Sequence, residues 1–220
     1  MRPSPSRERR EGGPGPEESR PLRYRPAREQ DVPQIVGIHG NAFPGFFLTE
    51  LGPRFLRVLY AGMVGSNDGV VIVAEDERLV GFVAGAPDQA SLYRQLRNRH
   101  LVSFGSAAAL ATVRNPGWAF RLLRAIGRPG EAASMPSKAC MMSIAVNPLY
   151  QASGAGSQLV RQFEARLIER GCKDYCLTTD MEHNAPVRKF YERLGLSVVR
   201  EITTREGRRM LEYYKRLAEE

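Results

Sequence analysis

Cysteine is scarce in this sequence, and its three residues, Cys140, Cys172 and Cys176, are odd in number. They lack paired C-x-x-C spacing and lie in apolar segments. A zinc site or a disulfide framework is therefore not expected, and buried free thiols are the better interpretation. Long apolar runs are also missing, since Leu101–Val113 is shorter than the roughly 20 residues that cross a bilayer. The basic N-terminus has no apolar core, which argues against a secretory signal. We expect a cytosolic protein without a transmembrane segment.

The charge of the chain is strongly positive, with a formal net value of +8 over 220 residues. The excess is mostly arginine, scattered along the chain without the interleaved aromatics of a nucleic-acid surface. Binding to nucleic acid is therefore not expected, whereas a positive field suits an anionic small molecule such as a nucleotide cofactor. Residues 1–20 contain no large apolar side chain and are predicted to be a disordered tail, because such a segment buries too little surface to offset its ordering entropy.

Hydrophobic periodicity predicts alternating helices and strands from Leu22 onward. The predicted strands are Leu22–Ala27, Val70–Ala74, Leu79–Ala86, Lys138–Val146, Asp174–Thr179, Leu196–Thr203 and Met210–Leu217. The predicted helices are Glu29–Asn41, Thr49–Gly62, Gly154–Arg170 and Ala185–Leu194. Thr49 is a candidate N-cap for its helix, and Gly171 and Gly195 end theirs. This order predicts one α/β (α+β) domain over residues 21–220, a mixed sheet flanked by helices.

The stretch Ser143–Gly156, SIAVNPLYQASGAG, leads from a strand through a turn into a helix. Gly154 and Gly156 permit a positive φ and remove side chains that would block a ligand. The amides of the turn and of the first helical residues have no intrahelical partners. Together with the helix dipole they form a pocket for phosphate oxygens. On the glycines alone, a tight connection without a ligand is the simpler explanation.

Two motifs in this part of the chain carry a resemblance to a known family. Gln151-Ala152-Ser153-Gly154-Ala155-Gly156 fits the (Gln/Arg)-x-x-Gly-x-(Gly/Ala) loop of the GNAT superfamily of acetyl-CoA-dependent N-acetyltransferases. Ile144–Pro148 resembles that family's fourth strand and its exit. Further on, Asn184–Leu196, NAPVRKFYERLGL, is similar to the family's Asn-x-x-Ala-x-x-Phe-Tyr-x-x-x-Gly-Phe segment, with departures at Val187 and Leu196. Because both motifs occur in order and between the right elements, the resemblance is specific over about residues 22–217.

The resemblance implies a mixed, largely antiparallel seven-stranded sheet with a helical insertion after the third strand. It implies transfer of an acetyl group from acetyl-CoA to a primary amine of a small molecule, by direct attack in a ternary complex and without a metal. The pyrophosphate of CoA would lie on the amides of Gln151, Ala152, Ser153, Gly154, Ala155, Gly156 and Ser157. Pantetheine would lie beside Ile144, Ala145 and Val146, with Asn184 on the other side.

The resemblance also suggests how the reaction proceeds. An amide N–H of Ala145 or Val146 would polarise the thioester carbonyl. Tyr191 is similar to a tyrosine that many members place near the sulfur. A phenol with an ordinary pKa near 10 can donate a proton to a thiolate whose conjugate acid has a pKa near 8.5. Judged by spacing alone, Tyr191 would be a core residue and Asn184 a helix N-cap.

Several alternatives stay open at this stage. The general base could be Asp180, Glu182, His183, His39 or Glu50, each of which is more often a surface group or cap, or it could be water. The acceptor could be a peptide or protein amine, and the chain could be a non-catalytic CoA-binding module. A homodimer is an open alternative too.

The predicted insertion, residues 88–136, contains helical segments around Leu92–Ala111 and Trp118–Ile126. In the second segment arginines alternate with large apolar side chains. Such a segment can lie on a membrane or a polyanion, although it more often packs as an ordinary helix with its arginines in solvent. A lid that shapes the acceptor pocket is the third interpretation.

Overall fold

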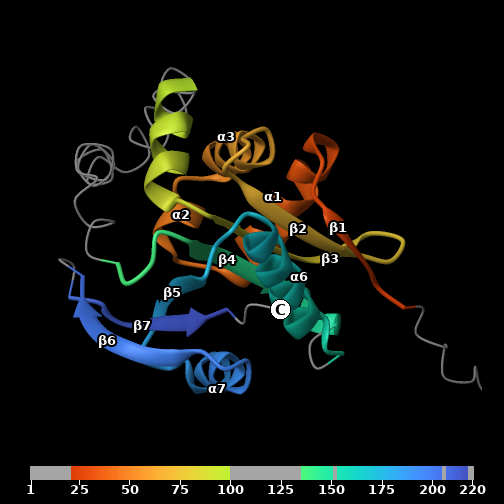
Figure 1. Cartoon of the computed structure of the whole chain (residues 1–220). Helices are drawn as coiled ribbons and strands as arrows, with labels where there is room; N and C mark the ends of the chain where they lie inside the picture. Colours follow the sequence, from red (N-terminus) through yellow and green to blue (C-terminus); the bar gives the residue numbers. More distant parts are fainter. Residues whose placement is uncertain (1–20, 100–134, 151–152, 205–206, 218–220) are drawn as a thin grey trace, which may run out of the picture.

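The computed structural model describes residues 21–99, 135–150, 153–204 and 207–217. Within them, one seven-stranded sheet has the strand order β1-β2-β3-β4-β5-β7-β6 (Figure 1). The predicted tail, residues 1–20, and most of the predicted insertion lie outside the described residues.

The described elements follow the predicted order closely. The strands are β1 (Arg23–Pro26), β2 (Val70–Glu75), β3 (Leu79–Ala86), β4 (Cys140–Val146), β5 (Asp174–Asp180), β6 (Ser197–Thr203) and β7 (Arg209–Arg216). The helices are η1 (Glu29–Asp31), α1 (Val32–Ala42), α2 (Phe47–Glu50), α3 (Pro53–Val64), η3 (Pro148–Tyr150), α6 (Ala155–Glu169) and α7 (Ala185–Arg193). Residues 89–99 are also helical.

The sheet is mixed and largely antiparallel, as predicted. Among the described strands, only β4 and β5 pair in parallel, whereas every other neighbouring pair is antiparallel. A parallel pair needs a crossover connection, and α6 supplies it between β4 and β5. The crossover therefore lies directly beside the strand pair that matters for the site.

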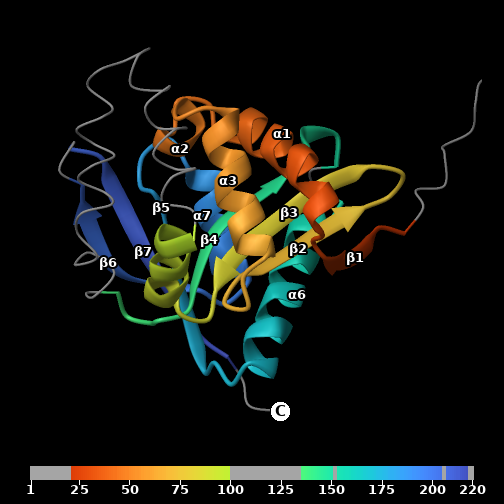
Figure 2. The ribbon, with the colours of Figure 1, turned by 90° about the horizontal axis from the view of Figure 1, so that it is seen from above.

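Two apolar cores cover the two faces of the sheet. Alternate residues of β2 point to opposite faces, so that Val70 and Ile72 pack with α6 and α7 whereas Val71 and Val73 pack with α1 and α3. Figure 2 shows α1 and α3 on one face and α6 on the other. Gly85 on β3 allows close approach, since a Cβ there would lie 2.2 Å from the Cys140 carbonyl oxygen and 2.6 Å from the Phe163 ring.

The predicted N-cap at Thr49 is wrong. Thr49 lies inside the short helix α2, and Gly52, with φ of 88°, occupies the N-cap position of α3 with Pro53 following it. Proline at the first helical position and a glycine free to adopt a positive φ begin the helix without a side-chain cap. The thiol prediction holds for Cys140 and Cys176, which are buried, while Cys172 is half-buried.

Residues 89–99, the first part of the predicted insertion, belong to the main core. Leu92 and Leu96 are buried against the α1–α3 side of the sheet. Gln95 accepts a hydrogen bond from the Ser66 hydroxyl and donates one to Asp68. This segment is therefore an ordinary packed helix, and the predicted segment Trp118–Ile126 lies outside the described residues.

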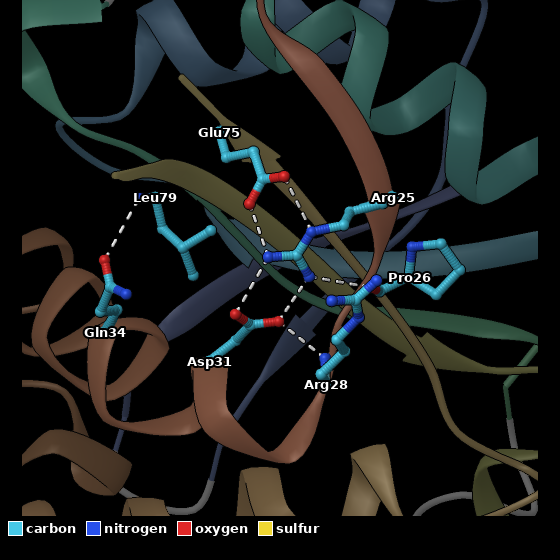
Figure 3. A network of polar contacts seen from close by, with 7 residues as sticks. All are labelled: Arg25, Pro26, Arg28, Asp31, Gln34, Glu75 and Leu79. Carbon is cyan, nitrogen blue, oxygen red and sulfur yellow. Dashed lines mark hydrogen bonds and ion pairs between the residues drawn. The ribbon is translucent and has the colours of Figure 1, made fainter. Parts of the chain in front are cut away.

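A polar network holds the edge strand β1 to the rest of the domain (Figure 3). The Arg25 guanidinium donates to both carboxylate oxygens of Asp31 at 2.6 and 3.1 Å, and to both of Glu75 at 2.9 and 2.5 Å. The Arg28 backbone N–H donates to Asp31 at 2.7 Å. One guanidinium thus joins β1, η1 and β2, which are far apart in the sequence.

Candidate functional site

Strands β4 and β5 pair at one position and then diverge. Their register contains the single pair Cys140↔Cys176, and the Cys176 N–H donates to the Ala139 carbonyl at 3.0 Å. Cys140 begins β4, whereas Cys176 lies inside β5, so the strands separate toward their C-terminal ends. The backbone of β4 beyond Cys140 is consequently open on the side that turns away from β3.

A β-bulge in β4 changes which side chains face this opening. Ala84 pairs with Ser143 and Gly85 with Met141, which leaves Met142 as the extra residue. A bulge lets two successive residues point to the same face. Met142 and Ser143 accordingly both line a cavity on the α3 side of the sheet.

The connection from β4 to α6 forms the other side of the opening. Gly154 is the N-cap of α6 and adopts the left-handed conformation, with φ of 83°. The Ser153 hydroxyl donates to the Tyr150 carbonyl at 2.7 Å and accepts from the Ala155 amide at 3.4 Å. In the described part of the chain, the amides of Gly156 and Ser157 have no hydrogen-bond acceptor, as expected for the first helical turn.

Of the two glycines expected to permit a positive φ, Gly154 adopts one and Gly156 does not. Gly156 is not among the residues with a positive φ, so its backbone does not need glycine. A Cβ at Gly156 would lie 3.4 Å from the Phe190 ring, an ordinary contact. Gln151 and Ala152 lie outside the described residues, while Ser153 and Gly154 are exposed at the mouth of the opening.

The remaining predicted cofactor residues on β4 follow the sheet alternation. Ile144 and Val146 pack against the α6 side, and Ala145 is buried against the α1 side. Asn184 stands at the N-cap position of α7, yet its side chain makes no capping hydrogen bond. Its amide instead donates to the Thr179 hydroxyl at 2.7 Å and to the Asp180 carbonyl at 3.2 Å. Asn184 therefore ties α7 to the end of β5.

Tyr191 lies on α7 with 6% of its surface exposed. Its ring is 5.3 Å from that of Phe190 and 5.7 Å from that of Tyr213. Burial raises the pKa of Tyr191 above its usual value. The pKa of this phenol therefore lies above the ordinary value assumed from the sequence, which favours the protonated hydroxyl at neutral pH.

A cavity of about 160 Å³ lies where β4 and β5 begin to part, between the sheet and α3. Its lining includes Tyr60, Cys140, Ser143 and Thr178, whose side chains carry polar atoms, together with Gln89 and Tyr93 from residues 89–99. Burial raises the pKa of Tyr60, and a hydrogen bond from Ser143 opposes that shift. This volume is close to that of an engineered cavity that holds benzene, so it suits a small or slender group.

His39 lies behind this cavity and is neutral. Its Nδ1 is 2.7 Å from the Tyr60 hydroxyl, and burial lowers the pKa of His39 to about 4. Its Nε2 is buried without a hydrogen-bond partner among the described residues. An imidazole in this environment resists protonation, which makes His39 a poor final acceptor for a proton.

Four other residues suggested as a base lie at or just after the ends of β5 and α2. Asp180 is paired with Arg208, whose guanidinium also lies 4.3 Å above the Phe46 ring. Glu182, with 62% of its side chain exposed, is 3.6 Å from Arg209. His183 and Glu50 are exposed as well. The connections before α2 and β7 thus meet beside the end of β5.

Tyr60, Ser143 and Glu212 were not predicted as residues of the site. Tyr60 lies within the predicted helix Thr49–Gly62, and Ser143 was assigned only to a strand. Glu212 alternates with the apolar residues Leu211 and Tyr213, a pattern that indicates a solvent-facing position, yet it is 2% exposed. The described residues contain no cluster of three or more His, Cys, Asp or Glu that could hold a metal, and no helix among them is long and apolar enough to cross a membrane.

Comparisons with known proteins agree with this geometry. Residues 33–196 match the family model described as the acetyltransferase (GNAT) family. No curated protein sequence matches the chain. The fold is similar to an N-acetyltransferase from Staphylococcus aureus Mu50, with 14% identity, a TM-score of 0.59, and coverage of 90% of this chain and 100% of that one.

Two further solved structures share the fold. The ribosomal-protein-S18-alanine N-acetyltransferase from Escherichia coli has 14% identity and a TM-score of 0.55, with 90% of this chain and 96% of that chain covered. The histone acetyltransferase HPA2 and related acetyltransferase from Corynebacterium glutamicum has 19% identity and a TM-score of 0.57, with 90% and 98% covered.

Proposed function

The chain belongs to the acetyltransferase (GNAT) family, and we propose that it transfers the acetyl group of acetyl-CoA to a primary amine of a small molecule. The observation that carries this proposal is the opening between β4 and β5, with the N-terminus of α6 at its edge. Extended backbone and free helix amides are what a thioester with a pyrophosphate tail requires. We expect the reaction to occur in the cytoplasm.

We assign different parts of the cofactor to different residues of the opening. We assign the pyrophosphate to the amides from Gln151 to Ser157, of which those of Gly156 and Ser157 are free of intrahelical partners. The pantetheine amides would pair with the open backbone of Ile144–Val146, as an added strand does. A β4 amide, of Ala145 or Val146, would donate to the thioester oxygen and stabilise the tetrahedral oxyanion.

Asn184 and Tyr191 would complete the cofactor side. The Asn184 amide nitrogen is occupied by Thr179 and Asp180, so its carbonyl oxygen is the atom assigned to CoA. The Tyr191 hydroxyl would donate to the departing thiolate sulfur. Because burial raises the pKa of this phenol, we assign it a hydrogen bond that grows with the charge on sulfur, rather than an early proton transfer.

The acceptor is assigned to the cavity beside β4. Its volume of about 160 Å³ favours a small or slender amine over a folded protein surface. Gln89 and Tyr93, from the first part of the predicted insertion, form one wall, so this segment takes part in shaping the pocket. Proton loss from the amine is assigned to water, since the described candidates for a base are paired, exposed or, as for His39, resistant to protonation.

The test of the cofactor assignment is Gly154→Val. A β-branched residue resists φ of 83° and would place its methyl groups in the amide pocket. We expect acetyl-CoA affinity, measured by calorimetry, to fall at least about tenfold, or about 1.4 kcal/mol.

Gly171→Val is the matched control at the other end of α6. Gly171 has φ of 76° and, like Gly154, open space where a Cβ would be built. Both variants carry the same backbone strain, so thermal unfolding should weaken alike in both. Equal acetyl-CoA binding in the two variants would overturn the cofactor assignment.

A further inference from the structure

Glu212 occupies an unusual position in the middle of β7. Its neighbours Leu211 and Tyr213 pack into the α6–α7 core, so the Glu212 side chain points to the opposite face. A charged residue there would normally reach solvent, yet Glu212 is 2% exposed. The fold therefore keeps a carboxylate out of water on the face that carries the cavity.

Within the described part of the chain, only one of its two carboxylate oxygens has a partner. Arg200 on the neighbouring strand β6 donates to Oε2 from Nε at 3.0 Å and lies 2.9 Å away through Nη2. Among the described residues, Oε1 is buried and has no hydrogen-bond donor. A buried carboxylate oxygen without a donor is costly, which points to a donor other than the described residues, and a bound ligand is one that can supply it.

Glu212 adjoins the wall of the cavity. It pairs directly with Thr178 across β5 and β7, and two residues directly opposite each other share a face. Thr178 and Cys140 line the cavity. A hydrogen bond with Cys176 and burial raise the pKa of the Cys140 thiol. The negative charge of Glu212 raises it further, because the carboxylate is close to the thiol. Glu212 is not part of the lining, so its carboxylate lies behind the wall that Thr178 and Cys140 form, and an elongated guest would reach Oε1 by displacing that wall.

The strand order separates Glu212 from the reacting group. Strand β7 lies two places from β4, which is about 10 Å at the usual strand spacing, and β4 and β5 diverge further. A carboxylate also stabilises the protonated form of a nearby ammonium, which opposes the proton loss that the attacking amine needs. Glu212 therefore suits a second cationic group, not the amine that attacks the thioester.

We propose that Glu212 Oε1 binds a second ammonium group of the acceptor, which makes the preferred substrate a slender aliphatic molecule with two amines. This inference rests on the proposed acetyl transfer for the position of the reacting amine. An ammonium has three donors and a full positive charge, and so satisfies an unpaired carboxylate oxygen. The aliphatic chain between the two amines would lie along the apolar part of the cavity.

The test compares 1,5-diaminopentane with 5-amino-1-pentanol, which differ only in the distal group. We expect calorimetry on the full chain to show at least tenfold tighter binding of the diamine, and an acetyl-transfer assay to show the same preference in KM. Glu212→Gln keeps the shape of the side chain but should bind both probes alike. Glu201→Gln is the matched control, because Glu201 forms an exposed cross-strand pair with Arg209 on the same two strands.

The outcomes separate the two proposals. A preference for the diamine that is lost in Glu212→Gln and kept in Glu201→Gln supports the inference. If no CoA thiol is released with any amine, the proposed transfer fails, but this binding result still supports the inference. Equal binding of the two probes to the unaltered protein, or a preference that survives Glu212→Gln, overturns the inference while thiol release tests the transfer separately. If Glu212→Gln does not fold, Arg200→Met decides: removing the competing cation should raise the preference, and an unchanged preference overturns the inference.

Discussion

Replacing Tyr191 with Phe is expected to lower kcat about 100-fold, with acetyl-CoA affinity nearly unchanged. The hydroxyl is needed mainly when negative charge develops on the departing sulfur, so its loss affects the transition state more than the bound substrate. The substitution removes one oxygen from a buried ring that otherwise keeps its contacts with Phe190 and Tyr213. Steady-state kinetics of thiol release, together with calorimetry for acetyl-CoA, measure the two quantities.

Tyr175→Phe is the control for the loss of a buried hydroxyl. Tyr175 lies in the same core as Tyr191 and donates to Glu164 at 2.7 Å. Its substitution should reduce thermal stability and leave kcat within about twofold, since β5 carries no assigned chemistry at that position. Burial raises the pKa of Tyr191, so the unaltered protein should show no loss of kcat from phenol ionisation near pH 10. Full kcat in Tyr191→Phe would return Tyr191 to a purely structural role.

Replacing Arg25 with Met is expected to reduce the free energy of unfolding by about 3 kcal/mol at pH 7. The change removes the one cation that two carboxylates share and leaves Asp31, with 4% of its side chain exposed, beside Glu75. Chemical denaturation at neutral pH measures the loss. Arg166→Met is the matched control, because the Arg166–Glu169 pair is largely exposed and should contribute under about 0.5 kcal/mol.

The same network predicts how stability depends on pH. Hydrogen bonds from Arg25 lower the pKa values of Asp31 and Glu75 below their usual values. A carboxylate with a lowered folded-state pKa stabilises the fold above its unfolded pKa, about 4, and loses that contribution as the pH falls through the folded value. The difference in unfolding free energy between the unaltered protein and Arg25→Met should therefore shrink below about pH 4. A difference that stays constant down to pH 2 would show that packing of the Arg25 side chain, and not its charge, stabilises the edge strand.

The sequence predicted the order and type of the described elements because each has a clear local signal. The continuous apolar, β-branched runs of β2 and β3, the amphipathic period of α6 and the glycines after α6 and α7 are local properties. The boundary between α2 and α3 was missed for the same reason. A threonine before an apolar run indicates an N-cap, but Gly52 followed by Pro53 begins the helix instead.

The loop and the α7 motif were recognisable because their residues are close together in the sequence. The acceptor side was not, because it depends on pairing between distant strands. The bulge at Met142 and the burial of Glu212 are consequences of register and of the Arg200 contact, which no periodicity in β4 or β7 specifies. Glu212 even contradicts its local pattern, and departures of this kind are expected where a fold carries a function.

The single register pair between β4 and β5 divides the sheet into two hydrogen-bonded ladders, β1–β4 and β5–β7–β6. Ladders with so few shared bonds open as separate cooperative units, each with its own free energy of opening. Native-state hydrogen exchange should accordingly show two blocks of protected amides, with the faster exchange along the inner edge of β4. A ligand that inserts between the strands would add bonds to both ladders, so that the two blocks would exchange as one.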